Sequence, residues 1–395
     1  MRALVMLHFI GVVIFASPMN GNVYQPAFSF SPSMQQLRTQ LLSLLLPQQG
    51  DTYDNLQLAA FDLEIPIIFE TLNSSGLWPD IDYYDVDARS DWPAATHLRR
   101  CLLFGTAFNS NASFFNTNES IAAAGTRCTA SWLALSPVNS NWWWMQLGTL
   151  QCIAKLLLLL PNANLTAQAN AEAFPRLSFA DVAGFIGANR VWGSLVHVFI
   201  GVLNSNETHV SQAFSLMTAA YSTVPGDTVM DGLQLDYSFH QHGPLAQMSY
   251  AYGGHFMANA LTMELAARGT PWAIGPTPSP EWTALTNYLL DGARWLSRGA
   301  EWAAGAMGRH NTYFTSQDSS GVTDGHYHSY AAYPLFGLAF PAWAPPFNSA
   351  TSVLYGRLLR HFGSESTYPR GVEIDAFYSQ VSVFFSVQVH KLAVL

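Results

Sequence analysis

Apolar residues recur at three- and four-residue spacing along most of the chain from Ile121 onward. This pattern predicts helices at residues 121–135, 143–160, 178–186, 189–204, 209–221, 243–267 and 281–304. The segments between them are short and contain Gly, Pro, Asn or Asp, so successive helices should lie antiparallel. We therefore expect a mainly α protein, an incomplete α/α toroid of antiparallel helical hairpins.

The chain before Ile121 is less regular. A helix is expected from Met34 to Leu46, because Ser31-Pro32-Ser33 is a typical helix start. A short helix is expected at residues 55–70. Residues 73–118 are rich in Asn, Ser, Asp and aromatic residues, which favours long loops with short helices. Ser279 and Pro280 mark the start of the last predicted helix.

The C-terminal part has a different pattern. Residues 314–370 are rich in Gly, Pro, Ser and Tyr, and 377–389 alternate like a strand. A lone strand pair is not stable by itself, so this segment resembles the start of a truncated β domain. The expected organisation is a signal peptide at 1–18, a toroid at 19–315, and a linker with the start of a β-sandwich at 316–395.

The N-terminus predicts secretion. Met1-Arg2 precedes an apolar run from Ala3 to Ala16, which is too short to span a bilayer and reads as a signal peptide. A buried N-terminal helix is the alternative, and no transmembrane segment follows. N-glycosylation sequons lie at Asn73, Asn111, Asn118, Asn164 and Asn206. A secreted, extracellular glycoprotein is expected.

Composition narrows the classes of partner. Charged residues make up 11% of the chain and the formal net charge is −9, which argues against nucleic acid. We expect a monomer that does not bind membranes once the leader is removed. The three cysteines show no zinc-site spacing and predict one disulfide, Cys101–Cys128, with Cys152 as a buried thiol.

Candidate chemistry concentrates between Leu233 and Gly254. This stretch holds His240, His242, Tyr250 and Tyr252 among glycines, in a chain with few charges. An imidazole and a nearby phenol are suited to proton transfer. By themselves, such residues are more often packing groups than catalysts.

Four motifs occur in order: Asn141-Trp142-Trp143, Gly187-Ala188-Asn189-Arg190, the run from Asp236 to Pro244 followed by Tyr252-Gly253, and Met307-Gly308-Arg309. Together they resemble polysaccharide lyase family 8, which contains the hyaluronate, chondroitin AC and xanthan lyases. The resemblance covers roughly residues 120–315. It implies an α/α toroid, followed in the family by a β domain, and cleavage of acidic polysaccharides by β-elimination.

Carried over by motif, the resemblance implies a role for six residues. Asn189 would hold the uronate carboxylate, with His242 and Tyr252 as the catalytic histidine and tyrosine. Arg309 would support the tyrosine, and Trp142 and Trp143 would stack on sugar rings. This set requires no metal or other cofactor, and the expected partner is an acidic polysaccharide of the chondroitin or hyaluronan kind.

The chain departs from the family pattern in three ways. The spacing from His242 to Tyr252 is one residue longer, so Tyr250 is a second candidate. A second family arginine falls on Tyr313. The family's supporting glutamate would lie beyond Leu395.

The residues suit the chemistry of elimination at a uronic acid. An Asn189 amide can donate hydrogen bonds to the carboxylate and stabilise the charge that develops there. A tyrosinate can remove the C5 proton, and the resulting phenol can protonate the leaving oxygen on C4. A nearby cation such as Arg309 favours the phenolate.

Each residue also has a structural interpretation. Asn189 could be an ordinary N-cap, His242 could bond a turn, Arg309 could cap a helix, and the Tyr and Trp residues could be core. Two other functions remain open. One is a catalytically impaired carbohydrate-binding relative; the other is an α/α-toroid glycoside hydrolase that uses Asp231 and Asp236.

Overall fold

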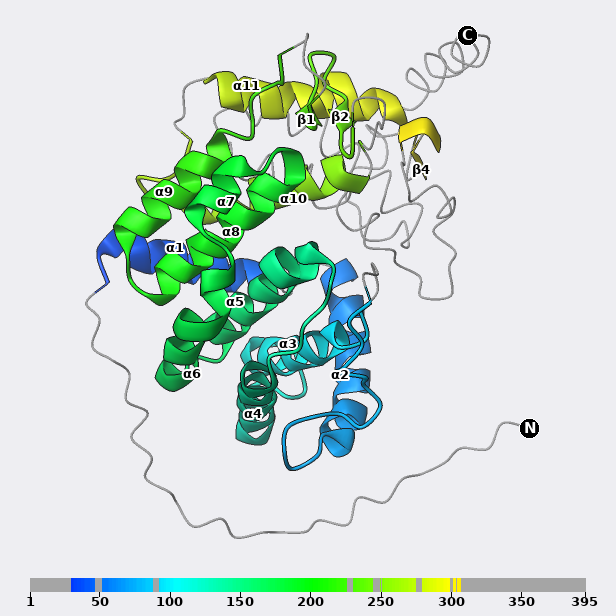
Figure 1. The fold of residues 1–395 in the computed structure, drawn as a ribbon, viewed down its shortest axis with the longest axis vertical. Helices are drawn as coiled ribbons and strands as arrows, with labels where there is room; N and C mark the ends of the chain where they lie inside the picture. Colours follow the sequence, from blue (N-terminus) through cyan, green and yellow to red (C-terminus); the bar gives the residue numbers. More distant parts are fainter. Residues whose placement is uncertain are drawn as a thin grey trace.

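The computed structural model describes residues 30–46, 52–87, 92–225, 230–243, 249, 251–274, 279–298, 301–302 and 304–306. The predicted signal peptide at 1–18, the linker and β segment at 316–395, Arg309, Tyr313 and Tyr250 lie outside these residues. Helices dominate the part that is described, as the apolar spacing predicts (Figure 1).

The helices fall at or near their predicted positions. The α-helices are α1 (Pro32–Leu45), α2 (Thr52–Thr71), α3 (Ala95–Asn109), α4 (Glu119–Leu135), α5 (Thr149–Leu159), α6 (Ala163–Gln168), α7 (Phe179–Gly184), α8 (Gly187–Leu203), α9 (Glu207–Thr218), α10 (Ala251–Ala267) and α11 (Pro280–Asn287). Short π- or 3-10 turns extend several of them: η1 (Trp144–Gly148), η2 (Ala169–Ala173), η3 (Phe174–Arg176), η4 (Tyr288–Gly292), η5 (Ala293–Leu296) and η6 (Ala304–Ala306).

Four predicted boundaries need correction. The helix predicted at 243–267 begins later, at Ala251, because Ser249 instead binds Phe239 and Tyr288. Residues 73–118 were expected to form loops with short helices, yet α3 has 15 residues, because Leu98, Cys101 and Phe104 are buried against neighbouring helices. The helix predicted at 55–70 is longer, and α2 continues through Pro66. The segment predicted as one helix at 281–304 ends its helical turns at Leu296.

Side-chain caps fix many of the helix starts. Ser31 accepts a hydrogen bond from the Met34 N–H at α1, and Ser178 forms a capping box with Asp181 at α7. Asn118, Asn162 and Asn206 cap α4, α6 and α9. These local signals set the starts of the capped helices independently of the tertiary structure.

Helix α8 is the central element. Every residue from Val191 to Val202 is buried, as expected of a helix that is apolar on all sides. It contacts α5, α7, α9 and α10, and α3 packs against both α4 and α5. Successive helices therefore pair as hairpins around a shared apolar core (Figure 1).

The described residues also include two short antiparallel strand pairs, which the sequence pattern did not predict. β1 (Gly232–Leu233) pairs with β2 (Phe239–His240), and β3 (Ser297–Arg298) pairs with β4 (Glu301–Trp302). The β1–β2 hairpin lies beside α11 at the top of Figure 1, far from α4 and α6. It carries the residues that precede His242.

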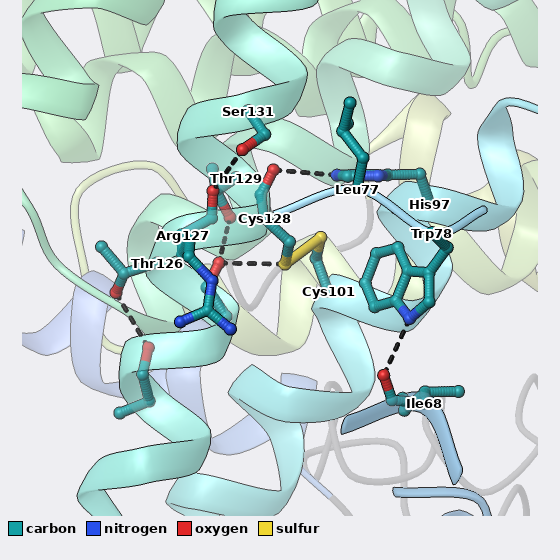
Figure 2. The surroundings of a disulfide bond; sticks show 12 residues. Ile68, Leu77, Trp78, His97, Cys101, Thr126, Arg127, Cys128, Thr129 and Ser131 are labelled. Atoms are coloured by element: carbon teal, nitrogen blue, oxygen red, sulfur yellow. Dashed lines mark hydrogen bonds between the residues drawn. A yellow bond between two sulfur atoms is a disulfide. The ribbon is translucent and has the colours of Figure 1, made fainter. Parts of the chain in front are cut away.

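The predicted pairing of cysteines is confirmed: Cys101 and Cys128 form a disulfide, and Cys152 is a free thiol. Both cysteines lie on helices, Cys128 on α4 as the predicted helix at 121–135 implies, and Cys101 on α3, where loops with short helices were expected. Figure 2 shows Trp78 and His97 beside this bond. The disulfide thus joins two helices that already form a hairpin.

Among the described residues, no helix combines the length and the apolar character that a membrane span needs.

Candidate active site

His242 and Tyr252 meet in space. His242 Nε2 and Tyr252 Oη are 2.8 Å apart, a hydrogen bond between an exposed imidazole and a half-buried phenol. The two rings are nearly perpendicular, with centroids 5.0 Å apart. The pair can therefore exchange a proton and still reach a molecule from solvent.

The β1–β2 hairpin and α10 place this pair. The hydroxyl of buried Ser249 accepts a hydrogen bond from the Phe239 N–H at 2.9 Å, and its carbonyl accepts one from Tyr288 Oη at 2.7 Å. Gly253 follows Tyr252, and a Cβ there would collide with Phe239 and Tyr288. The glycine of the Tyr-Gly motif therefore allows α10 to pack closely against the hairpin.

Asn189 lies in the first turn of α8, but it does not cap this helix. The N-cap position belongs to Ile186, which provides no side-chain hydrogen bond. The N-cap interpretation of Asn189 is therefore wrong. Instead, Gln241 Oε1 approaches the Ala188 N–H at 3.4 Å from the hairpin. This contact brings the first turn of α8 next to the residue that precedes His242.

Trp142 and Trp143 begin a row of aromatic rings. Trp142 is 46% exposed and its ring lies 5.4 Å from that of Phe185. The edge of Trp143 meets Trp192 at 5.6 Å, and Trp192 in turn lies 6.0 Å from Tyr252. Trp192 is three residues after Asn189, so both lie on similar sides of α8. The aromatic row thus reaches from the exposed Trp142 side to the His242–Tyr252 pair.

The local backbone explains how the tryptophans are presented. Residues Trp144–Gly148 form a π-helical turn, a rare conformation that is often found at functional sites. A Cβ at Gly148 would overlap the rings of Trp143 and Trp144. The Asn141 side chain accepts a hydrogen bond from the Trp143 N–H at 3.1 Å and so fixes the start of the turn.

The two acids considered for a hydrolase both brace loops. The Ser238 N–H and hydroxyl donate to Asp236 Oδ1 at 2.9 and 2.7 Å. Burial disfavours ionisation of Asp236, but the hydrogen bonds from Ser238 outweigh it and lower the pKa of this carboxyl. Asp231 binds Gln241 Nε2 at 2.6 Å and the Gly243 N–H at 3.0 Å. This use of both carboxylates does not favour a hydrolase.

One group of described residues has side chains close enough to hold a metal: His97, Cys101 and Cys128, all buried. The disulfide removes both thiolates. His97 Nε2 donates to the Cys128 carbonyl at 2.8 Å, and Nδ1 accepts from Tyr83 Oη at 2.9 Å. These contacts occupy both ring nitrogens, so the group is built as packing around the disulfide.

The structure therefore brings His242 and Tyr252 into contact and places Asn189, Trp142 and Trp143 on the elements that surround them. It does not describe Arg309. Sequence reasoning missed Phe185 and Trp192, which extend the aromatic row, and Gln241, which links the hairpin to α8. For Trp192 the sequence offered one signal. It follows Asn189 by three residues, about one helical turn, so both lie on similar sides of α8.

Comparisons with known proteins agree with these features. The profile of the polysaccharide lyase family 8, N terminal alpha-helical domain, matches residues 64–289. A chondroitinase-AC from Pedobacter heparinus is 26% identical over 244 residues, which are 59% of this chain and 34% of that protein.

Two solved structures share the fold. Streptomyces coelicolor chondroitin AC lyase, in complex with chondroitin sulphate, superposes with a TM-score of 0.70 at 17% identity, over 84% of this chain and 46% of that one. Paenibacillus xanthan lyase gives a TM-score of 0.67 at 19% identity, over 87% and 32%. The chain thus spans about a third of its curated relative and less than half of each of these structures.

Proposed function

Because the chain belongs to polysaccharide lyase family 8, we propose that it is a secreted lyase that cleaves a uronic-acid-containing polysaccharide by β-elimination. The observation that carries the proposal is the 2.8 Å contact between His242 Nε2 and Tyr252 Oη at the end of an aromatic row. An acid–base pair beside stacking rings suits a sugar polymer. Chondroitin or hyaluronan is the expected kind of substrate, because the curated relative is a chondroitinase-AC.

The proposed reaction needs no water and no change of oxidation state. Tyr252, as the phenolate, takes the proton from C5 next to the uronate carboxylate. The C4–O bond breaks as the C4=C5 double bond forms, and the phenol returns its proton to the departing oxygen. The adjacent imidazole of His242 can accept the phenol proton to form the phenolate before the first turnover, or act as the base for the other sugar epimer.

Stabilisation of the negative charge that develops is usually the largest single contribution to lowering an activation barrier. Removing a proton next to a carboxylate places a second negative charge on that group, so hydrogen-bond donors aimed at it accelerate the step. Asn189 is assigned this role because α8 presents it one turn from Trp192, which contacts Tyr252. Arg309 is assigned to Tyr252 by its motif alone.

The rings have a simpler role. An aromatic face stacks on the apolar face of a pyranose, and the exposed Trp142 and half-buried Trp143 would hold two positions along the polymer. Phe185 supports Trp142 from the segment that leads into α8. This arrangement orients the polymer across Tyr252.

The test is to incubate the full chain with chondroitin, hyaluronan and alginate and to follow ultraviolet absorbance. A lyase produces a conjugated unsaturated uronate, and absorbance rises with each cleavage. New reducing ends without absorbance would identify a hydrolase instead. Binding of the polymers without either product would identify a catalytically impaired relative, and both of these results would overturn the proposal.

A further inference from the structure

The backbone at His242 has an unusual conformation. Its φ is +65°, in the left-handed region that a residue with a side chain seldom adopts, and Gly243 follows with φ +118°. Such a conformation costs about 1–3 kcal/mol and persists only where neighbouring contacts hold it. Contacts from neighbouring residues must therefore hold the His242 backbone in place and its imidazole toward Tyr252.

One carboxylate binds the chain on both sides of His242. Asp231 Oδ2 accepts from the side chain of Gln241 at 2.6 Å, and Oδ1 accepts from the Gly243 N–H at 3.0 Å. Since Gly232 pairs with His240, residue 231 lies opposite 241 at the next step of the hairpin. The carboxylate therefore continues the strand pairing with a side chain and closes over the histidine backbone.

Gln241 also reaches the helix that carries Asn189. Its side chain is 1% exposed, and Oε1 lies 3.4 Å from the Ala188 N–H in the first turn of α8. Gly187 permits this approach, because its φ is +55° and a Cβ there would overlap the same oxygen. One buried side chain thus links the loop of His242 to the first turn that holds Asn189.

We propose that Asp231 and Gln241 are positioning residues that fix the His242 imidazole against Tyr252 and set its place relative to Asn189. The expected loss of kcat rests on the proposed function, whereas the expected change in the His242–Tyr252 hydrogen bond does not. Neither residue needs to touch the substrate. Their effect passes through the backbone at residues 241–243.

An exchange of the two functional groups tests the pair. Asp231→Asn places an amide against the Gln241 amide, and Gln241→Glu places two carboxylates together, so each single variant loses the contact. In the double variant D231N/Q241E, the new amide donates to the new carboxylate, and the Asn oxygen still accepts from Gly243. Such networks are best apportioned by this kind of cycle.

We expect each single variant to lower kcat by about 10–100-fold, by analogy with groups that orient metal ligands, with KM nearly unchanged. The double variant should recover most of the loss at an unchanged melting temperature. Single variants that fold and keep the full kcat would overturn the proposal. So would a double variant as impaired as the singles.

A second measurement separates this inference from the proposed lyase activity. In protein labelled with ¹⁵N at histidine, the His242 Nε2 resonance reports its hydrogen bond to Tyr252 in the absence of substrate. Loss of that signature in Asp231→Asn, and its return in the double variant, supports positioning even if no polymer is cleaved. An unchanged signature in all three proteins overturns it.

A different observation concerns the sequons. All five sequon asparagines are exposed, and four of them lie at one end of the helical array, three in connections between helices and one in the first turn of α6: Asn111, Asn118, Asn206 and Asn164. Asn111 and Asn118 lie between α3 and α4, Asn164 follows α5, and Asn206 follows α8.

Ring contacts identify this end of the helices as the one farther from the His242–Tyr252 pair. The start of α3, the turn before α5 and the start of α8 lie close together. Trp92, just before α3, lies 6.0 Å from Trp144 in that turn, and Trp143 lies 5.6 Å from Trp192 on α8. The far ends of α3 and α5 also meet, where Asn109 donates to the Leu159 carbonyl at 2.9 Å. The 17 residues of α8 separate the two ends by about 25 Å.

We infer that these four asparagines carry N-linked glycans that coat the end of the toroid opposite the His242–Tyr252 pair. In the transfer, the amide nitrogen bonds to C1 of an oligosaccharide and loses a proton, while a lipid diphosphate leaves. Charged residues are only 11% of the chain, against about a quarter in typical domains, so this end gains solubility from sugar instead. The end that carries the His242–Tyr252 pair stays open to a long polymer.

The full chain secreted from a eukaryotic host is treated with peptide:N-glycosidase in heavy-oxygen water, which converts each glycosylated asparagine into a labelled aspartate. Label at all four positions is expected, with elimination activity the same before and after treatment. Unlabelled asparagine at these positions overturns the inference. A rise in activity after treatment contradicts the statement that the glycans leave the end with the His242–Tyr252 pair open.

Variants need care because two of these asparagines cap helices. Asn118 and Asn206 accept hydrogen bonds from the first turns of α4 and α9, so their sequons are removed with Ser120→Ala and Thr208→Ala. At Asn111 the hydroxyl of Ser113 binds Asp62 at 2.6 Å, so Asn111→Gln is the safer change. With Thr166→Ala, the combined variant should lose all label at these sites and aggregate at lower concentration. Unchanged solubility would count against the solubilising role.

Discussion

Within the part of the chain that the structure describes, two tyrosine–histidine hydrogen bonds have opposite surroundings. Tyr83 Oη and His97 Nδ1 are 2.9 Å apart, and Tyr252 Oη and His242 Nε2 are 2.8 Å apart. His97 is completely buried beside the disulfide, whereas His242 is exposed on a loop with positive φ. The same pair of side chains is thus a packing element in one region and a candidate acid–base pair in the other.

The two pairs differ in what else the histidine meets. His97 also binds the buried Cys128 carbonyl, whereas His242 is exposed. His97 Nε2 must carry its proton, because it donates to the Cys128 carbonyl, so Nδ1 accepts from Tyr83. Burial raises the pKa of the Tyr83 phenol and lowers the pKa of His97 to about 4. Both groups are therefore held neutral near pH 7. A pair that must exchange protons needs access to solvent or substrate, which only the His242 region offers.

The largest expected effect is on catalysis. Tyr252→Phe should lower kcat by about 10²–10⁴-fold, because the acid–base group is removed while the ring remains. The free energy of unfolding should stay within experimental error of the parent. Initial rates of ultraviolet absorbance and a urea unfolding curve measure both quantities. Full activity in this variant would place the base elsewhere, with Tyr250 the next residue to test.

Removal of the disulfide should have the next largest effect. Cys101→Ser opens a loop of 27 residues and should lower the free energy of unfolding by about 3 kcal/mol. The activity of the folded fraction should not change, since the bond lies in the His97 region. Reduction of the parent protein with a thiol is the matched control. A loss of kcat greater than the loss of folded protein would show that the two regions are coupled.

Lowering the pH should decrease the free energy of unfolding through two buried histidines, His97 and His197. The pKa of His97 falls from 6.5 to about 4 in the folded protein because burial disfavours its charged form, and His197 is shifted to about 4 for the same main reason. Between these pH values the unfolded chain binds more protons. Stability is therefore complete above about pH 6.5 and falls toward pH 4, by on the order of 3 kcal/mol per histidine.

Urea unfolding measured from pH 7 to pH 4 tests this slope. His97→Gln keeps an N–H donor for the Cys128 carbonyl but cannot titrate, so the slope should become shallower. A parallel profile in the variant would mean that other groups cause the acid sensitivity.

Tyr83→Phe is the counterpart of Tyr252→Phe. Without the hydroxyl, His97 Nδ1 and the Trp78 N–H lose their shared buried partner, which should lower the free energy of unfolding by about 1–3 kcal/mol. The kcat of the folded protein should be unchanged. If Tyr83→Phe lowered kcat as much as Tyr252→Phe, the contrast between the two regions would be lost.

The last prediction concerns a third tyrosine, whose carboxylate partner is buried. Glu264 on α10 accepts from Tyr221 Oη at 3.3 Å and from the Ile274 N–H at 3.1 Å, and burial raises its pKa from 4.5 to about 7. The folded state therefore keeps the proton longer than the unfolded state does. Stability from this group is complete below about pH 4.5 and is lost as pH rises through 7.

Glu264→Gln should remove this alkaline loss. The variant should be more stable than the parent at pH 8 and similar to it at pH 4.5, as measured by thermal unfolding at both values. A parent that gains stability from pH 5 to pH 8 as steeply as the variant would contradict the assignment.

The sequence by itself determined much of the fold. Three- and four-residue apolar spacing located α4, α5, α7, α8 and α9 within a few residues, since a helix needs an apolar stripe to pack. Cap residues such as Ser31 mark a helix start through bonds to the next turn, which are local in sequence. The order of short motifs indicated the family, because each motif lies within a few consecutive residues.

Only the tertiary structure decided what surrounds each motif. It showed that Asn189 does not cap α8, that Gln241 approaches this helix from 53 residues away, and that Asp231 lies across the backbone of His242. It also made α3 a full helix, through burial against α4 and α5. These results depend on contacts between residues far apart in the chain, and their free energy exists only once the helices have packed.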